Sequence, residues 1–317
     1  MQINIPEISS QIYKEQTFGI LEQKYSVLGP MWISHQTEWL NNVYQSFKDH
    51  DKFLILIYLI KKTLDFYSRN FIKLNYDEFY FNDTLEIEKF NIIEIANYLN
   101  IPKESARRKV LELEKNGVIK KINRKIIVDR SAFPFVKPIN SIKRISRFLS
   151  LFSEMLVKEK ILLHPLTSIQ LQRVIEKNFS FVWKLYYEMQ IPMMISYKKI
   201  FNDLEAFHIH GICIDNQHTH TQKLNINDVN RPDFIKSIYS NGNIVGLNAM
   251  SIADITGIPR ATVVRKLRIL LEKKFLLIDE KKHYKLTGQA KQLIPLQSEV
   301  LKKLANFSSN VFNLTLL

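Results

Sequence analysis

The stretch NIIEIANYLNIPKESARRKVLELEKNGVIKKINRKIIVD, residues 91–129, decides the fold of this 317-residue chain. Apolar residues recur at helical spacing from Asn91 to Leu99, which predicts a short amphipathic helix. Pro102 follows closely. The residue before a proline disfavours the α conformation, whereas the proline itself suits the first turn of a new helix. The stretch therefore begins with two helices joined by a tight turn.

The second helix carries an apolar stripe from Ala106 to Leu113, and Gly117 can adopt the left-handed conformation that ends it. Two strand-like runs, VIKKI and KIIVD, then flank a predicted hairpin tip at Asn123 and Arg124. Helix, tight turn, helix and β-hairpin, in that order, are typical of a winged helix-turn-helix.

A second copy of this pattern lies 157 residues further along the chain, which is the distance from Ile101 to Ile258. A gapless self-alignment at that spacing gives seven identities, which pair Ile95, Ala96, Ile101, Pro102, Arg108, Lys109 and Leu113 with Ile252, Ala253, Ile258, Pro259, Arg265, Lys266 and Leu270. In this copy GIPR forms the turn, and FLLID and HYKLT flank a hairpin tip at residues 280–282. Lys274 stands where the helix would be expected to end in a glycine, so we expect a less regular helix end there.

An internal repeat changes how the whole chain is divided. We predict a mainly α protein with small β-wings (α+β), made of two winged helix-turn-helix domains with flanking helices. Residues 1–145 would hold a helical N-terminal segment and the first such domain, at about 90–130. Residues 146–317 would hold connecting helices, the second domain at about 247–288 and a C-terminal helix.

Both copies resemble the DNA-binding domains of winged-helix transcription regulators of the MarR and GntR type. The segments IANYLNIPKESARRKVLELEKNGVI and IADITGIPRATVVRKLRILLEKKFLLI share that family's pattern of a turn, a polar second helix, a leucine and an entry into the wing. The resemblance implies that the second helix of each copy enters the major groove of double-stranded DNA, with its N-terminal part against the base edges.

That geometry assigns base-reading roles to eight residues on the two second helices, which are Lys103, Ser105, Arg107 and Arg108 in the first copy and Arg260, Thr262, Val264 and Arg265 in the second. Arginine can fork onto guanine and valine can meet a thymine methyl, so the two copies should prefer different half-sites. Seven wing residues should mostly contact phosphate or the minor groove, and these are Lys120, Lys121, Arg124, Lys125, Lys281, Lys282 and His283.

The net charge of the chain is +14, and it is concentrated in the two copies. Residues 101–125 contain nine Lys or Arg and three Glu, and residues 258–285 contain nine Lys or Arg and three Asp or Glu, so each window carries +6. Such a bias suits neutralisation of phosphates. The alternative is that the units bind protein and that their basic surface is incidental.

The remaining sequence is that of a soluble, helix-rich protein without a signal peptide. A single cysteine excludes an intramolecular disulfide and fits the cytoplasm, and the longest apolar run, residues 53–60, is too short for a membrane span. Two long helices are expected between Gln36 and Phe79, with residues 53–60 buried. Three aromatic residues are expected in the core or, alternatively, in a pocket for an unknown effector, and these are Trp183, Tyr186 and Tyr187.

The helices that follow each wing have their own apolar stripes. One, between Ile142 and Leu156, is expected to pack on the first winged domain, and SEVLKKLANFSSNVFNL occupies the matching place near the C-terminus. These helices offer a homodimer interface. Alternatively, the two fused units already supply the symmetry of a dimer and the protein is a monomer.

One segment, FHIHGICIDNQHTH, gathers four of the eight histidines and the only cysteine. A turn at Asp215 and Asn216 would make it a hairpin with paired imidazoles on each strand, an arrangement suited to zinc, nickel or copper. The candidate ligands would be His208, His210, Cys213, His218 and His220. Their spacing matches no established zinc finger, so no metal or other cofactor is expected, and metal binding remains the alternative.

Taken together, the sequence favours a sequence-specific DNA-binding protein, most simply a transcription regulator. No phosphate-cradling glycine loop or nucleophile elbow is present, so we do not expect an enzyme. Two other readings stay open. One is a plasmid-type replication initiator that binds repeated origin sites, and the other is a winged-helix protein that grips other proteins.

Overall fold

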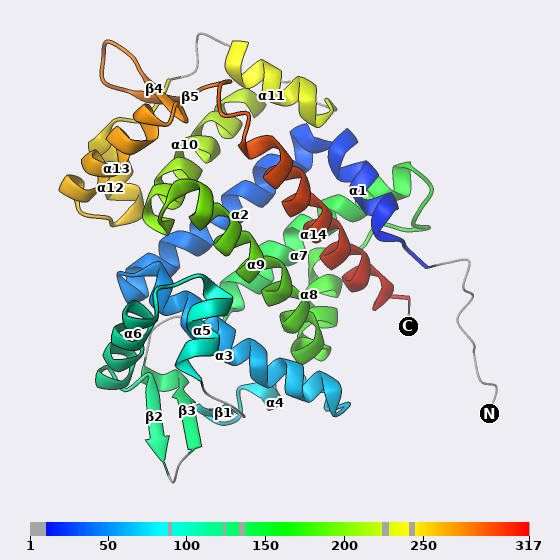
Figure 1. Ribbon diagram of the computed structural model, residues 1–317. Helices are drawn as coiled ribbons and strands as arrows, with labels where there is room; N and C mark the ends of the chain where they lie inside the picture. The colour runs from blue at the N-terminus through cyan, green and yellow to red at the C-terminus, as the bar shows by residue number, and fades with distance from the viewer. Residues whose placement is uncertain are drawn as a thin grey trace.

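The computed structural model describes residues 11–87, 91–122, 125–132, 137–223, 228–240 and 245–316. It is mainly helical with two small antiparallel sheets (Figure 1), which confirms the expected mainly α class with small β elements. In the described part of the chain, no helix is both long enough and apolar enough to cross a membrane.

The first half contains a three-stranded sheet among helices. Its elements are α1 (Lys14–Gln23), α2 (Tyr25–Phe47), α3 (His50–Arg69), α4 (Tyr76–Phe79), β1 (Thr84–Ile87), α5 (Ile92–Leu99), α6 (Lys103–Lys115), β2 (Ile119–Ile122), β3 (Lys125–Asp129), a 3₁₀ turn (Arg130–Ala132) and α7 (Ile139–Lys158). The two helices and the hairpin predicted within residues 91–129, here called the first unit, are confirmed. Two long helices were expected between Gln36 and Phe79; they are α2, which begins earlier at Tyr25, and α3, which ends at Arg69. Residues 54–60 are buried as expected, and Phe53 is half-buried.

The second half follows a similar order. Its elements are α8 (Ser168–Lys177), α9 (Phe179–Phe201), α10 (Leu204–Gln222), α11 (Arg231–Ser240), α12 (Ala249–Thr256), α13 (Arg260–Glu272), β4 (Leu276–Ile278), β5 (Tyr284–Leu286) and α14 (Leu293–Asn313). Helices α12 and α13 with the β4–β5 hairpin form the second unit, as predicted.

The sequence did not indicate strand β1. It pairs antiparallel with β3, so the strand order in the first sheet is β1-β3-β2. In the described part of the second half, Leu247 takes the corresponding place through an isolated bridge to Tyr284. Four residues of strand, or one, are too few for an alternating pattern to be recognised.

The expectation of an irregular end to the second helix of the second unit is wrong. Lys274 adopts a left-handed φ of 57°, and Gly117 at the corresponding place has a φ of 74°. The closing hydrogen bonds also correspond: Val118 N donates to Leu113 O at 3.0 Å, and Phe275 N donates to Leu270 O at 2.8 Å. Lysine therefore takes the same helix cap as glycine, at a conformational cost.

The duplication extends far beyond the two units. Helices α1, α2 and α3 correspond to α8, α9 and α10, with matching lengths for the first two pairs and a spacing of 154 residues, as between the N-cap residues Asp49 and Asp203. Identical residues at this spacing include Gln16 and Gln170, Ser26 and Ser180, Phe47 and Phe201, Phe53 and Phe207, Ile55 and Ile209, and Ile60 and Ile214. Three extra residues before the second unit change the spacing to 157, so a gapless alignment on the units misses these matches.

The halves exchange equivalent contacts. Ser26 N donates to Val229 O at 3.2 Å, and Val229 N donates to Ser26 Oγ at 2.9 Å. Ser180 and Leu74 make the same pair of bonds, both at 3.0 Å. Helix α2 accordingly packs along α10 of the other half, and α9 packs along α3. Reciprocal contacts of this kind indicate an approximate twofold relation between the halves.

The flanking helices are buried within the single chain. The stripe of α7 packs mainly on α2 and α8, with Trp32 and Phe148 ring centroids 5.1 Å apart, so the expectation that it packs on the first unit is wrong. Helix α14 packs on α1 and α9, where Tyr186 meets Phe307 at 5.9 Å. Their apolar faces are therefore occupied by the chain itself and not left for a second copy.

Candidate nucleic-acid interface

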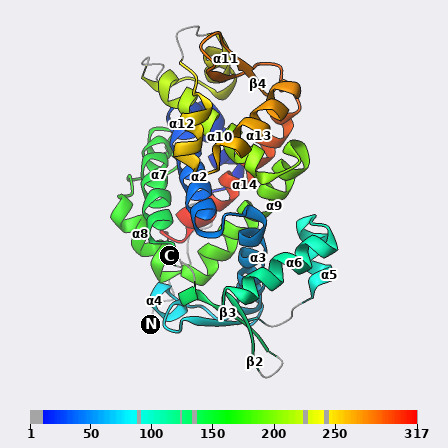
Figure 2. The ribbon, with the colours of Figure 1, turned by 90° about the vertical axis from the view of Figure 1, so that its left-hand side faces the viewer.

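The two units lie on the same face of the molecule. Helices α5 and α6 and helices α12 and α13 occupy the left-hand side in Figure 1, and Figure 2 looks onto that side. The β2–β3 and β4–β5 hairpins lie at opposite ends of this face (Figure 2). The face therefore presents two similar helix pairs, each with a hairpin pointing away from the centre.

The orientation of α6 follows from its apolar stripe. Ala106, Val110 and Leu113 are buried, so the opposite side of the helix faces solvent. Lys103, Arg107 and Arg108 are exposed there, as the sequence predicted for base-reading side chains, and Ser105 is half-buried beside them. Arg107 Nε donates to Glu104 Oε2 at 3.0 Å, a pairing on the surface that leaves Arg108 as the freer guanidinium.

Helix α13 is oriented in the same way by Val263, Leu267 and Leu270. The predicted contact residues of this helix divide by exposure: Arg260 and Arg265 are exposed, whereas Thr262 and Val264 are half-buried. Among the described residues neither arginine has an ion-pair partner. A further exposed arginine on this helix, Arg268, was missing from the predicted set.

One identical residue of the repeat faces inwards. Lys109 is bonded to Asp49 and lies 3.7 Å from Asp51, while Lys266 Nζ lies 2.6 Å from Asp203 Oδ2 and close to Glu205. The carboxylates cap and begin α3 and α10, so each lysine ties the second helix of its unit to the long helix beneath it. These two cations of the +6 windows are thus internal, and their pairing could not be found from helical spacing.

The cations of the first wing are exposed but paired. Lys120 Nζ donates to Asp129 Oδ2 at 2.5 Å, and Lys121 and Lys125 lie 2.6 Å and 3.0 Å from Glu114 and Glu86. The hydrogen bond from Lys120 is the main cause of the lowered pKa of Asp129, with Ser131 adding to it. Arg124, also predicted for this wing, lies outside the described residues.

The second wing is less neutralised. Lys281 and Lys282 are exposed at the predicted tip, and no ion pair of either is seen in the part of the chain that the structure describes. His283 is half-buried, with Nδ1 3.6 Å from Asp279 Oδ2. Among the described residues, the β4–β5 hairpin therefore presents two cations without an ion pair, whereas Lys120, Lys121 and Lys125 of the first hairpin are paired.

The predicted histidine hairpin is wrong. Residues 204–222 form helix α10, whose N-cap Asp203 accepts a hydrogen bond from Ala206 N, and this helix takes the place that α3 takes in the first half. The candidate ligands point to different surroundings instead of converging. Within the described ranges, no group of three or more His, Cys, Asp or Glu side chains is placed to hold a metal ion.

The histidines of α10 serve packing and hydrogen bonding. His208 Nδ1 lies 3.2 Å from His50 Nε2, and its Nε2 lies 2.7 Å from Asn41 Oδ1, so His208 joins α10 to α2 and α3. Burial lowers the pKa of His50 to about 4 and that of His218 to about 4, and raises the pKa of the Cys213 thiol to about 12. His220 is half-buried. Neutral imidazoles and a thiol, rather than charged groups, therefore fill this part of the core.

Comparison with known proteins adds no assignment: no family model, no curated protein and no solved structure matches this chain.

Proposed function

We propose that this protein binds double-stranded DNA sequence-specifically through two winged helix-turn-helix units, most simply as a transcription regulator. The observation that carries the proposal is the placement of Arg108 and Arg265. They occupy identical positions of the repeat, are both exposed, and lie on helices that share one face (Figure 2). Paired arginines on two projecting helices suit bidentate contacts with guanine in successive major grooves.

The element order supports the winged-helix reading. In the first half a helix (α3) and a strand (β1) precede α5 and α6, and the β2–β3 hairpin closes the sheet. In the second half α10, the Leu247 bridge, α12, α13 and the β4–β5 hairpin follow in the same order. Helix, strand, two helices and a hairpin are the parts that place a second helix in a major groove with a wing beside it.

The twofold relation between the halves favours an inverted site. Two reading helices related by rotation meet the two strands of a duplex equivalently, so their half-sites form an imperfect palindrome spaced by about one helical turn, roughly 10 base pairs. Arg107 in the first unit corresponds to Val264 in the second, and these side chains cannot select the same base. The expected site is therefore an inverted repeat with dissimilar halves.

Selection of bound fragments from random duplex DNA, at near-physiological salt, tests the proposal. An enriched inverted motif with unequal halves is the expected result. Tandem direct repeats would instead indicate a replication initiator, whose sites are repeated near an origin. Salt-sensitive binding without any enriched motif would indicate a protein-binding or architectural role and would contradict sequence-specific regulation.

A further inference from the structure

The second half contains a cavity of about 380 Å³ between the second unit and the long helices. Its walls come from α2, α9, α10, α11 and α14 and from the end of β5, and they are mostly apolar. The volume falls within the range of about 300–1,000 Å³ that is usual for small-molecule sites. It is far larger than one or two buried waters require.

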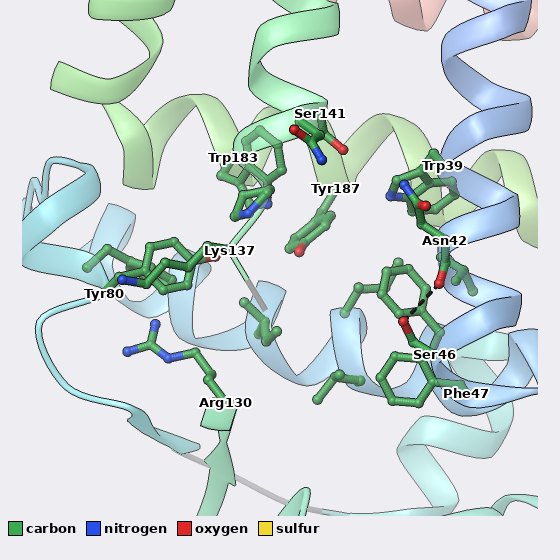
Figure 3. A pocket seen from close by; sticks show the side chains of 18 residues that line it. Trp39, Asn42, Ser46, Phe47, Tyr80, Arg130, Lys137, Ser141, Trp183 and Tyr187 are labelled. Carbon is green, nitrogen blue, oxygen red and sulfur yellow. Dashed lines mark hydrogen bonds between the residues drawn. The ribbon is translucent and has the colours of Figure 1, made fainter. Parts of the chain in front are cut away.

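The duplication provides an internal comparison. The matching cavity of the first half is only about 90 Å³ (Figure 3). Trp39, Trp183 and Tyr187 surround this smaller cavity, where their side chains are drawn in Figure 3. An aromatic lining thus occupies in the first half much of the space that stays open in the second.

Two adjacent positions on the corresponding helices differ in residue type between the cavities. Leu56 and Ile57 of α3 line the small cavity, and His210 and Gly211 replace them on α10 in the large one. A Cβ added at Gly211 would meet Thr37 Cγ2 at 3.7 Å, an ordinary contact distance. The glycine is therefore not required by a close backbone approach. It is unfavourable within a helix, and its consequence here is open volume.

Polar groups without protein partners line the same cavity. His210 is only 3% exposed, and among the described residues no hydrogen bond reaches its ring. The side-chain oxygen and nitrogen of Gln36 and the indole nitrogen of Trp32 are buried and equally unsatisfied. Buried polar groups are normally hydrogen-bonded, so several orphan groups around one cavity point to a missing partner.

The charges of the cavity are already compensated. Arg231 lies in its wall, but the guanidinium donates to Glu22 at 2.8 Å and to Gln297 at 3.3 Å. Burial lowers the pKa of His210 to about 3, so the imidazole is neutral near pH 7 and offers one donor and one acceptor. An occupant with a net charge would find no counter-ion available.

We propose that this cavity binds a neutral, mostly apolar small molecule that carries a hydrogen-bonding group for His210 or Gln36. The inference does not depend on DNA binding, because it rests on the volume and lining of the cavity alone. The occupant would contact both α10 of the second half and the scaffold helices α2 and α14.

The test uses N-phenyl-1-naphthylamine, a neutral fluorescent probe with a single N–H donor, added to the full-length protein without DNA. Saturable binding with a stoichiometry of one is expected, since the first-half cavity is too small for the probe. Trp32 lines the cavity, so probe binding should also quench tryptophan emission. Absence of saturable binding up to the solubility limit of the probe would overturn the proposal.

Two variants locate the site. Gly211→Leu fills the cavity and should weaken probe binding at least tenfold, whereas Gly19→Leu, at a helical glycine of α1 with open space around it, should leave binding unchanged. If Gly211→Leu does not fold, as judged by circular dichroism, Gly211→Ala serves instead and should weaken binding two- to threefold. Equal probe affinity in the folded Gly211 variant and the wild type would place the probe elsewhere and overturn the proposal.

A third variant tests the hydrogen bond. His210→Leu restores the residue type of Leu56, and it should weaken N-phenyl-1-naphthylamine binding at least fivefold. The isosteric 1-benzylnaphthalene has a methylene in place of the N–H. Its own affinity, measured by displacement of the probe, should be the same for the wild type and for His210→Leu. If both compounds lose affinity to the same extent in His210→Leu, the imidazole only shapes the cavity and the assigned hydrogen bond is wrong.

Discussion

Lys266 Nζ lies 2.6 Å from Asp203 Oδ2, and Lys109 makes the same ion pair with Asp49 in the first half. Each lysine stands in the middle of the second helix of its unit, and each aspartate caps the long helix beneath it. The carboxylate already accepts backbone N–H groups of that cap, so the lysine completes a small charged network. The exposed arginines beside Lys109 and Lys266 are held in position by these buried neighbours.

Replacing Lys266 with methionine should destabilise the protein by about 2 kcal/mol, because the half-buried Asp203 keeps its charge and loses its partner. Urea unfolding followed by circular dichroism measures the change. Lys103→Met, at an exposed position of α6, should change the free energy of unfolding by less than about 0.5 kcal/mol. Similar losses in both variants would mean that the buried pair has no special role.

Replacing Lys274 with glycine should stabilise the protein by about 1 kcal/mol, because a left-handed backbone is strained for any residue with a Cβ. Thermal unfolding measures the change. Lys274→Ala separates strain from charge, since it removes the ammonium and retains the strained conformation. Gly117→Ala should show the opposite sign at the corresponding cap, with a loss of about 1 kcal/mol. A stabilisation of Lys274→Ala equal to that of Lys274→Gly would refute the strain explanation.

Arg108→Ala and Arg265→Ala should each weaken binding to the selected DNA by about 1–3 kcal/mol and relax base preference at one position of one half-site. Fluorescence anisotropy with the selected site and its point variants measures both effects. Arg173→Ala, at an exposed arginine of α8, is the matched control and should bind as the wild type does. Unchanged affinity in both Arg108→Ala and Arg265→Ala would refute the assignment of α6 and α13 as reading helices.

The free cations of the second wing should act through phosphate. The double substitution Lys281→Ala and Lys282→Ala should lower affinity for all sequences alike and reduce the slope of log Kd against log salt by about 2. Titrations between low and near-physiological salt measure that slope. Lys120→Ala should reduce it less, because Asp129 already compensates Lys120. A change of selected motif in the double variant would mean that the wing reads bases.

Acid should destabilise the fold before the carboxylates are protonated. Burial lowers the pKa of His35 and His210 to about 3 and that of His50 and His218 to about 4, whereas an unfolded imidazole has a pKa of about 6.5. Between these values the unfolded chain binds more protons, so the contribution to stability is fully present above about pH 6.5 and is lost as the pH falls to about 4 for His50 and His218 and to about 3 for His35 and His210. Urea unfolding at a series of pH values measures the slope.

His50→Leu removes one of these groups and should flatten the pH dependence by up to about 1.4 kcal/mol per pH unit. An identical slope in the wild type and in His50→Leu would mean that His50 has the same pKa in the folded and unfolded states, and would refute the lowering by burial.

The elements that depend on local signals were predicted correctly. Pro102, Gly117 and the apolar spacing between them fix a helix, a turn and a buried face within a few tens of residues. Because that face is buried, the opposite side must be exposed, which is why Arg108 and Arg265 could be placed in advance. The ion pairs of Lys109 and Lys266 with the helices beneath them were not predicted, because spacing along a helix does not show what lies beneath it.

Residues 204–222 show the limit most clearly. Their alternating polar and apolar residues favoured a hairpin, yet they form α10, which is buried against α2, α9 and the second unit. A helix covered on almost every side needs no apolar stripe, so the periodicity that marks a surface helix is missing. The full extent of the duplication was hidden for a related reason, since three inserted residues break the register while equivalent contacts persist in space.

The sequence by itself thus determined the two units, the exposed faces of their second helices and their positive charge, because these depend on neighbours close along the chain. The tertiary structure alone decided the reciprocal hydrogen bonds of Ser26 and Ser180 with the opposite half. It also decided the ion pairs of Lys109 and Lys266 and the cavity beside Gly211. Each of these depends on which distant helix lies opposite, and that is set by packing of the whole core and not by any local pattern.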